Sequence, residues 1–313
     1  MQTHKLQLAA LVAAGSLFAA SPALATSQNQ EGQGSTVVTI LSNNETPGGI
    51  SQDDLHLKVD GKVSNITGWT ALHSPESPLQ VVILIDNDAR SSLGTQMSDI
   101  AQFIQGLPPS AKVAVAYMEN GRAALAAPLT TDHAAAVSEL HLPLEGMPGV
   151  SASPYFCLSD LAKHWPSTDA RARREVVMVT DGVDYYEVHY DPNDPYVAAA
   201  LRDSIRAHLI VYSIYWRNQG LLGRTGYADF DGQNLLAQLT RATGGKSYWE
   251  GFGNPVNFGP YFADIDKRIH NQYELDFMTP LGSKPQMESL NLQVSAHMKI
   301  DAPQQVYVHP GTE

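Results

Sequence analysis

Hydrophobic residues form two unbroken runs in this chain, and both runs lead into aspartates. The runs and their aspartates are Val81–Ile85 with Asp86 and Asp88, and Val176–Val179 with Asp181 and Asp184. An apolar run of this length between polar turns is typical of a parallel strand that is buried on both faces. The carboxyl ends of parallel strands meet at one edge of a sheet, where open α/β folds bind their ligands. We therefore expect the four aspartates to lie together at that edge.

Between residues 78 and 252, strand-like and helix-like patterns alternate. Helical spacing of apolar residues occurs at 93–104, 132–140, 158–165, 195–208 and 233–242, and strand-like runs occur at 112–118, 209–215 and 247–249. Asn120-Gly121 predicts a turn into an antiparallel edge strand at 122–128. Together these elements predict an α/β domain with a doubly wound, mostly parallel sheet of the Rossmann-like type.

The two ends of the chain show a different pattern, in which apolar and polar residues alternate. Within residues 36–77, Asp60-Gly61 separates two alternating segments, which is a strong hairpin signal. Within residues 253–313, we expect a helix at 260–270 and strands at 272–278, 290–298 and 305–308. Neither end has enough strands to bury a sheet face alone. We therefore predict that 36–77 and 253–313 pair into a small antiparallel β-domain.

The first 25 residues resemble a signal peptide. Lys5 precedes an apolar run from Leu6 to Ala20, and Ala23-Leu24-Ala25 fits a cleavage site. The polar, glycine-containing residues 26–35 are expected to form a disordered lead. These features predict a periplasmic or secreted protein with no transmembrane segment once the signal is removed.

Composition narrows the classes of partner. The formal net charge is −12, and no basic run indicates contact with nucleic acid. The single cysteine, Cys157, excludes a disulfide within one chain, and its apolar neighbours predict a small core residue. The 11 histidines show no spacing typical of a zinc site.

Several motifs together resemble a known family. They are the strand that ends in Asp86, Val179-Thr-Asp-Gly182 and their order in the chain, with Ile50–Lys62, Asp191–Tyr196, Ile210–Tyr215, Gly244–Tyr248 and Asn271–Asp276 as further landmarks. The chain resembles a von Willebrand factor type A (VWA) domain, and within that class the exported VWFA-related family of acidobacterial type. The resemblance covers nearly all residues after the signal peptide. It implies a fold much more specifically than it implies an activity.

VWA domains of this kind often carry a metal-ion-dependent adhesion site with the pattern Asp-x-Ser-x-Ser, a loop Thr and a later Asp. Carried over onto this sequence, the pattern places Asp86 and Asp181 at the Asp positions, Asp88 and Arg90 at the Ser positions, and Ser151 or Ser153 at the Thr position. Such a site would hold Mg²⁺ or another divalent cation through Asp86, Asp88 and Asp181. Arg90 departs from the pattern, because its guanidinium can pair with the carboxylates and take the place of the cation.

A loop rich in tyrosine follows the second aspartate pair. It contains Tyr185, Tyr186 and Tyr190, next to Asp184 and at the rim of the expected ligand edge. Tyrosines at such a rim are frequent in protein recognition, since they supply a large contact area at a small entropic cost. The same tyrosines could instead pack on neighbouring helices in a loop held by prolines, and the sequence leaves both readings open.

These features favour a non-enzymatic extracytoplasmic binding module that recognises a protein or other ligand at a degenerate adhesion site. The ligand would contact Arg90, Ser151, Ser153, Asp184 and the three rim tyrosines. The alternative is a Mg²⁺-dependent phosphohydrolase of the haloacid-dehalogenase type, with Asp86 as nucleophile and Asp88 as general acid. Arg90 stands where that pattern has Thr or Ser, and no lysine is placed for phosphate binding.

Overall fold

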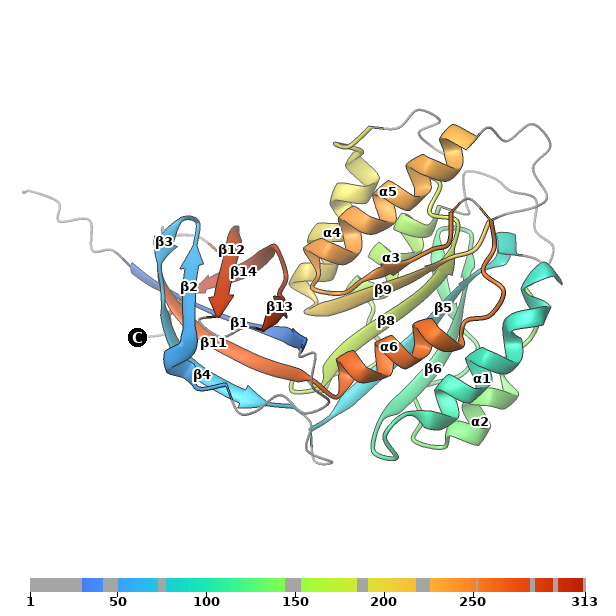
Figure 1. The fold of residues 1–313 in the computed structure, drawn as a ribbon, viewed down its shortest axis with the longest axis horizontal. Coiled ribbons are helices and arrows are strands. Elements are labelled where there is room, and N and C mark those ends of the chain that lie inside the picture. The colour runs from blue at the N-terminus through green and yellow to red at the C-terminus, as the bar shows by residue number, and fades with distance from the viewer. Residues whose placement is uncertain are drawn as a thin grey trace, which may run out of the picture.

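The structure, a computed structural model, contains two sheets that lie side by side (Figure 1). It describes residues 30–41, 50–72, 77–89, 91–143, 153–184, 191–217, 226–251, 253–281, 285–294 and 298–311. The first sheet, with its helices, forms a mixed α/β unit, and the second is antiparallel. None of the described helices is both long enough and apolar enough to cross a membrane.

The α/β unit is built on a six-stranded sheet with the order β10-β9-β8-β5-β6-β7. The strands are β5 (Leu79–Asp86), β6 (Lys112–Glu119), β7 (Arg122–Leu125), β8 (Arg173–Thr180), β9 (Leu209–Tyr215) and β10 (Ser247–Tyr248). β5 and β8 are adjacent and parallel, with Ile85 opposite Val179. The edge strand β7 is antiparallel to β6, as Asn120-Gly121 predicted. The two apolar runs therefore do lie side by side, and their carboxyl ends share one edge.

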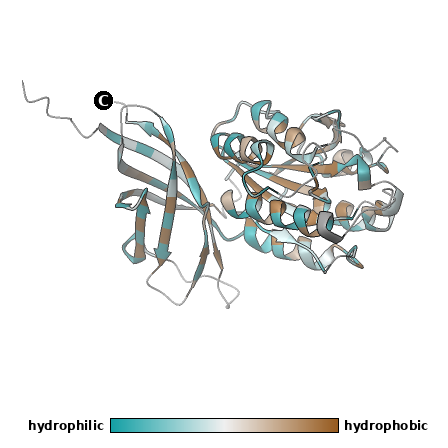
Figure 2. Cartoon of the chain, turned by 90° about the horizontal axis from the view of Figure 1, so that it is seen from above, coloured by the Kyte–Doolittle hydropathy of each residue, from teal (hydrophilic) through white to brown (hydrophobic). Residues whose placement is uncertain are grey.

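Helices cover both faces of this sheet (Figure 1). They are α1 (Met97–Gly106), α2 (His133–Ser138), α3 (Pro154–Lys163), α4 (Pro195–Arg206), α5 (Gly226–Ala242) and α6 (Gly259–Ile269). Alternate residues of β5 enter two separate cores: Ile83 and Ile85 pack with α1 and α6, whereas Val82 and Leu84 pack with α3, α4 and α5. Figure 2 shows the resulting concentration of hydrophobic residues on the central strands. Each fully buried aliphatic side chain contributes roughly 1.5–3 kcal/mol, which explains why both runs are uninterrupted.

The second sheet combines strands from both ends of the chain in the order β3-β2-β12-β14-β1-β11-β4, with β13 also paired to β1. These strands are β1 (Gln30–Leu41), β2 (Leu55–Val59), β3 (Lys62–Val63), β4 (Asn65–Ala71), β11 (Gln272–Leu281), β12 (Gln286–Val294), β13 (Lys299–Asp301) and β14 (Gln305–Pro310). Its core includes Val38, Ile40, Leu275, Phe277 and Val308. Asp60 and Gly61 both have positive φ values, 48° and 73°, as the predicted β2–β3 hairpin turn requires.

Two expectations about local structure need correction. We expected residues 26–35 to be a disordered lead, but 30–35 belong to β1, because residues 30–39 pair along their whole length with β11. The region of the predicted 93–104 helix begins as a 3₁₀ segment, Ser91–Gln96, and becomes α-helical only at Met97. Pairing with a distant strand stabilises the polar residues 30–35, which have no hydrophobic pattern of their own.

A buried arginine connects the two sheets. Arg173, at the start of β8, donates from Nη1 to the carbonyl of Ile269 (2.9 Å) and to Oε1 of Gln272 (2.5 Å). Gln272 begins β11, so this one side chain joins the α/β sheet to the antiparallel sheet. Each hydrogen bond from a charged, buried donor contributes roughly 1.5–3 kcal/mol to the stability of the fold.

Candidate functional site

The carboxylate of Asp86 lies where β5 and β8 end. Thr180, the last residue of β8, donates its hydroxyl to Asp86 Oδ2 (2.6 Å), and the backbone N–H of Asp88 donates to Asp86 Oδ1 (2.9 Å). Asp86 is only 2% exposed. The two bonds fix the orientation of the carboxylate and tie the turn after β5 to the end of β8.

The turn after β8 is equally well defined. Gly182 has a φ of +68°, and its N–H donates to the Thr180 hydroxyl (3.1 Å). The N–H of Val183 donates to Asp181 Oδ1 (2.9 Å), and the buried Tyr155 hydroxyl of α3 donates to the Gly182 carbonyl (2.7 Å). The positive φ favours glycine at this position because it has no Cβ.

Helix α5 holds this turn in place by direct backbone contact. A Cβ on Gly232 would overlap the carbonyl oxygen of Asp181, so the helix lies against the turn at a distance that only glycine permits. A Cβ on Gly182 would in turn meet Leu236 and the Gly232 carbonyl. The helix and the turn are therefore matched to each other, and the position of Asp181 depends on α5.

Four carboxylates gather at this edge. Asp86, Asp88, Asp181 and Asp184 are all buried. Burial raises the pKa of Asp86 well above its ordinary value, and the negative charges of Asp181 and Asp88 raise it further. Like charges brought together out of water favour a proton, a metal ion or a cationic side chain at the same place.

Ser153 is at the start of α3, the helix whose Tyr155 hydroxyl bonds to the turn after β8. It occupies the N-cap position, yet its side chain makes no capping bond, and its buried hydroxyl has no hydrogen-bond partner within the described part of the chain. Tyr155, two residues on, has a pKa raised by burial and then by the charges of Asp184 and Asp181, so this end of α3 faces the aspartates. A buried hydroxyl without a hydrogen-bond partner is chemically suited to bind a hard cation.

The geometry of a metal centre is nevertheless not formed by these side chains. Across the described ranges, no three His, Cys, Asp or Glu side chains are arranged so that they could hold one ion. The oxygen donors of the aspartates and Ser153 suit Mg²⁺ chemically, whereas their present arrangement does not form a site for it.

Arg90, Ser151, Tyr185, Tyr186 and Tyr190 lie outside the described residues.

The structure adds residues to the site that sequence reasoning did not single out. Thr180 and Tyr155 position the carboxylate and the turn, and Gly182 and Gly232 allow the close contact. The sequence did contain a signal for Thr180. Its hydroxyl side chain ends the apolar run 176–179, and this run was expected to lie beside the strand that ends in Asp86. Nothing in the sequence indicated Tyr155 or Gly232, which come from helices far along the chain.

The single cysteine is a core residue. Cys157 is fully buried in the core, as predicted, and burial raises the pKa of its thiol, which disfavours the nucleophilic thiolate.

Comparison with known proteins gives a likeness in fold. No protein-family model matches the sequence, and a search of curated proteins finds no relative. An aerotolerance-related membrane protein from Bacteroides fragilis is 17% identical and aligns over 61% of this chain and 98% of its own, with a TM-score of 0.43. The PilB minor pilin from Streptococcus sanguinis is 12% identical over 66% of this chain and 63% of its own, with a TM-score of 0.47. The VWA domain of SpRpn10 is 13% identical over 57% of this chain and 96% of its own, with a TM-score of 0.36.

The identities of these three structures are low, so the likeness concerns the fold alone. A VWA domain is among the structures similar to this chain, and all three TM-scores are below 0.5. Membership of the exported acidobacterial family stays a prediction.

Proposed function

We propose that this chain is a non-enzymatic binding module whose ligand is recognised at the edge formed by Asp86, Asp88, Ser153, Asp181 and Asp184. The observation that carries the proposal is the burial of four aspartates at the carboxyl edge of β5 and β8, where burial and the charges of Asp181 and Asp88 raise the pKa of Asp86. Groups with strongly perturbed pKa values, held at the carboxyl edge of an α/β sheet, are characteristic of functional sites. Structural packing alone gives no reason to bury several like charges together.

We further propose a doubly wound VWA-type domain, exported to the periplasm or secreted, with a degenerate adhesion site. The order of the strands around β5 and the helices on both faces of the sheet support this architecture. In the sequence, Arg90 replaces a serine that the adhesion pattern requires, and its guanidinium would supply the positive charge that the carboxylates need. A protein or other ligand would then be recognised without a metal ion.

Calorimetric titration of the purified chain with Mg²⁺, Mn²⁺ and Ca²⁺ tests the role of Arg90. We expect no saturable binding by the native chain, binding gained in Arg90→Ser, and loss of that binding when Asp181→Ala is added. Binding by the native chain that disappears in Asp181→Ala would instead mean a working metal site.

An activity assay tests the non-enzymatic character. We expect no turnover of an aryl phosphate by the native chain with Mg²⁺ present. Turnover that Asp86→Asn abolishes would refute the binding-module proposal in favour of a phosphohydrolase.

A further inference from the structure

A cleft of about 770 Å³ opens between the α/β unit and the antiparallel sheet. The α/β unit lines it with α5, β10 and α6, and the antiparallel sheet lines it with the end of β1 and with β13. None of the residues at the aspartate edge belongs to this lining. The volume is within the range of roughly 300–1,000 Å³ that is usual for small-molecule sites.

The lining is rich in cationic side chains. They are Arg241, Lys246, Lys267, Arg268 and Lys299, whereas its carboxylates are Asp264 and Asp301. Five positive and two negative groups give the cleft a formal charge of +3, in a chain whose net charge is −12. A locally positive cavity in an acidic protein attracts anions, because the surrounding low-dielectric walls concentrate its field.

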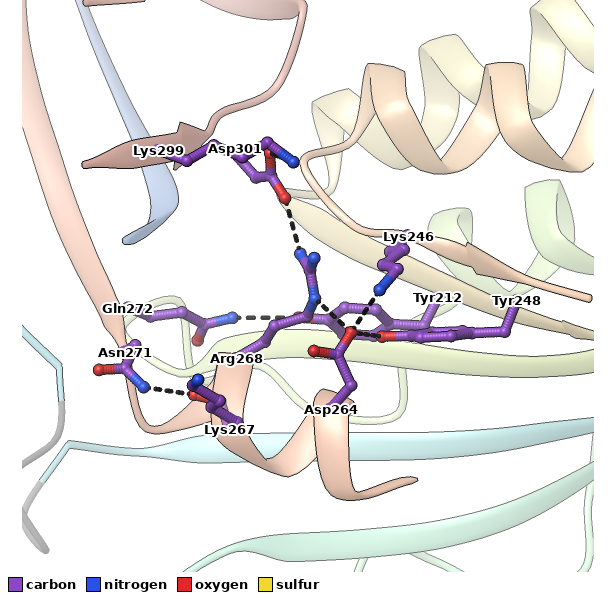
Figure 3. Close-up of polar contacts among 10 residues, drawn as sticks. All are labelled: Tyr212, Lys246, Tyr248, Asp264, Lys267, Arg268, Asn271, Gln272, Lys299 and Asp301. Atoms are coloured by element: carbon purple, nitrogen blue, oxygen red, sulfur yellow. Dashed lines mark hydrogen bonds and ion pairs between the residues drawn. The ribbon is translucent and has the colours of Figure 1, made fainter. Parts of the chain in front are cut away.

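Asp264 is already satisfied by three donors (Figure 3). Its Oδ2 accepts from Lys246 Nζ (2.7 Å), the Tyr248 hydroxyl (2.8 Å) and Arg268 Nε (3.1 Å). Although burial opposes ionisation, the bonds from Lys246, Tyr248 and Arg268 lower the pKa of Asp264 to about 2. Asp264 is therefore ionised at neutral pH, and it serves to orient the cations around it.

Arg268 joins the two sides of the cleft. It is buried on α6, and its Nη1 donates to Asp301 Oδ2 (3.0 Å) on β13, as Figure 3 shows. Since Nε is bonded to Asp264, the guanidinium is held between two carboxylates from different units. The guanidinium is therefore fixed in position before any ligand arrives, which lowers the entropic cost of binding.

Two cations of the lining have no carboxylate of their own. Within the described ranges, neither Lys267 nor Arg241 forms a salt bridge; Arg241 Nε donates only to the backbone carbonyl of Ala237 (2.9 Å). Trp249, 42% exposed, adds a flat apolar face to the same lining. Together they offer charge, hydrogen-bond donors and an apolar surface.

We propose that this cleft binds a small anionic molecule with at least two negative charges on phosphate or carboxylate groups. Guanidinium and ammonium groups bind both kinds of oxyanion through charge-assisted hydrogen bonds. The ligand contacts the α/β unit through Arg241 and Lys267. It contacts the antiparallel sheet through the exposed Lys299, whose Nζ lies 3.2 Å from Asp301 Oδ1, so its binding joins the two units more firmly. The site is independent of the aspartate edge and of the function proposed there.

Calorimetry with two probes tests the proposal and distinguishes a phosphate ligand from a carboxylate ligand. Inorganic pyrophosphate and citrate are titrated into the purified chain at low and at physiological ionic strength. We expect saturable binding of at least one probe, weakened by salt. Binding of pyrophosphate alone identifies a phosphate ligand, and binding of citrate alone identifies a carboxylate ligand.

Paired variants locate the site. In Arg241→Gln with Lys267→Gln we expect the Kd to rise by about tenfold or more, because two charge-assisted contacts are lost. The matched control, Lys62→Gln with Lys112→Gln, removes two exposed lysines from other parts of the molecule and should leave the Kd unchanged. Absence of saturable binding of both probes, an unchanged Kd in the first pair, or an equal loss in the control pair would overturn the proposal. Circular dichroism and Tm of each pair show that the fold is retained.

Discussion

Replacing Asp264 by Asn removes one charge from the network that connects α6, β10 and β13. The pKa of this carboxyl is lowered from 3.8 to about 2, and at about 1.36 kcal/mol per pKa unit this corresponds to about 2 kcal/mol of stability at neutral pH. The Asp264 side chain is 31% exposed, so screening by solvent makes its contribution to stability smaller than this value. We expect Asp264→Asn to lower the free energy of unfolding by about 1 kcal/mol at pH 7.

The pH dependence distinguishes charge from packing. Because the carboxyl has a lower pKa when folded than when unfolded, its contribution is fully present above 3.8 and is lost as the pH falls toward 2. In urea titrations, the difference between native chain and variant should therefore be constant from pH 7 to pH 5 and fall to about half by pH 3.

Asp266→Asn is a matched control on the same helix. Asp266 has a pKa raised by burial, partly offset by His270, so it gives no stability at neutral pH that the variant could lose. A loss in Asp264→Asn that persists unchanged at pH 3, or an equal loss in Asp266→Asn, would refute the electrostatic reasoning.

Three further predictions concern the aspartate edge. Asp86→Asn should raise the free energy of unfolding at pH 7. It should also reduce the loss of stability with rising pH, because a raised pKa means that the folded chain loses stability as this carboxyl ionises. Urea titrations from pH 5 to pH 8 measure both effects. Tyr155→Phe should cost about 1–2 kcal/mol, because the Gly182 carbonyl loses its buried donor. Gly232→Ala should cost roughly 1–3 kcal/mol, because the added methyl displaces α5 from the Asp181 carbonyl. Thermal or urea unfolding measures both.

Each of these three has a clear contrary outcome. A loss of stability at pH 7 in Asp86→Asn would mean that attraction to the charge of Arg90 outweighs the cost of burying the Asp86 carboxylate. An unchanged free energy of unfolding in Tyr155→Phe would mean that water replaces the lost hydroxyl donor. A neutral Gly232→Ala would show that α5 can move away from the turn at no cost.

The central strands and the place of the acidic edge could be predicted from sequence alone. Residues 81–85 and 176–179 are apolar on both faces, and only the middle of a covered sheet buries both faces of a strand. Asp86 follows the first run directly and Asp181 follows the second after Thr180, so adjacency of the strands brings both aspartates to one edge. Asp60-Gly61 also predicted its turn from sequence alone, because these two residue types adopt the positive φ values that the turn requires.

Only the tertiary structure determined which residues from distant parts of the sequence contact each other. Residues 30–35 form a strand only because β11 offers backbone partners, and no local pattern reports this. Tyr155 and Gly232 reach the aspartate edge from α3 and α5, and Arg241, Lys267 and Lys299 meet in one cleft although they are far apart in the chain. Periodicity records which face of an element is buried, whereas these contacts depend on how the elements pack, and packing is a property of the whole fold.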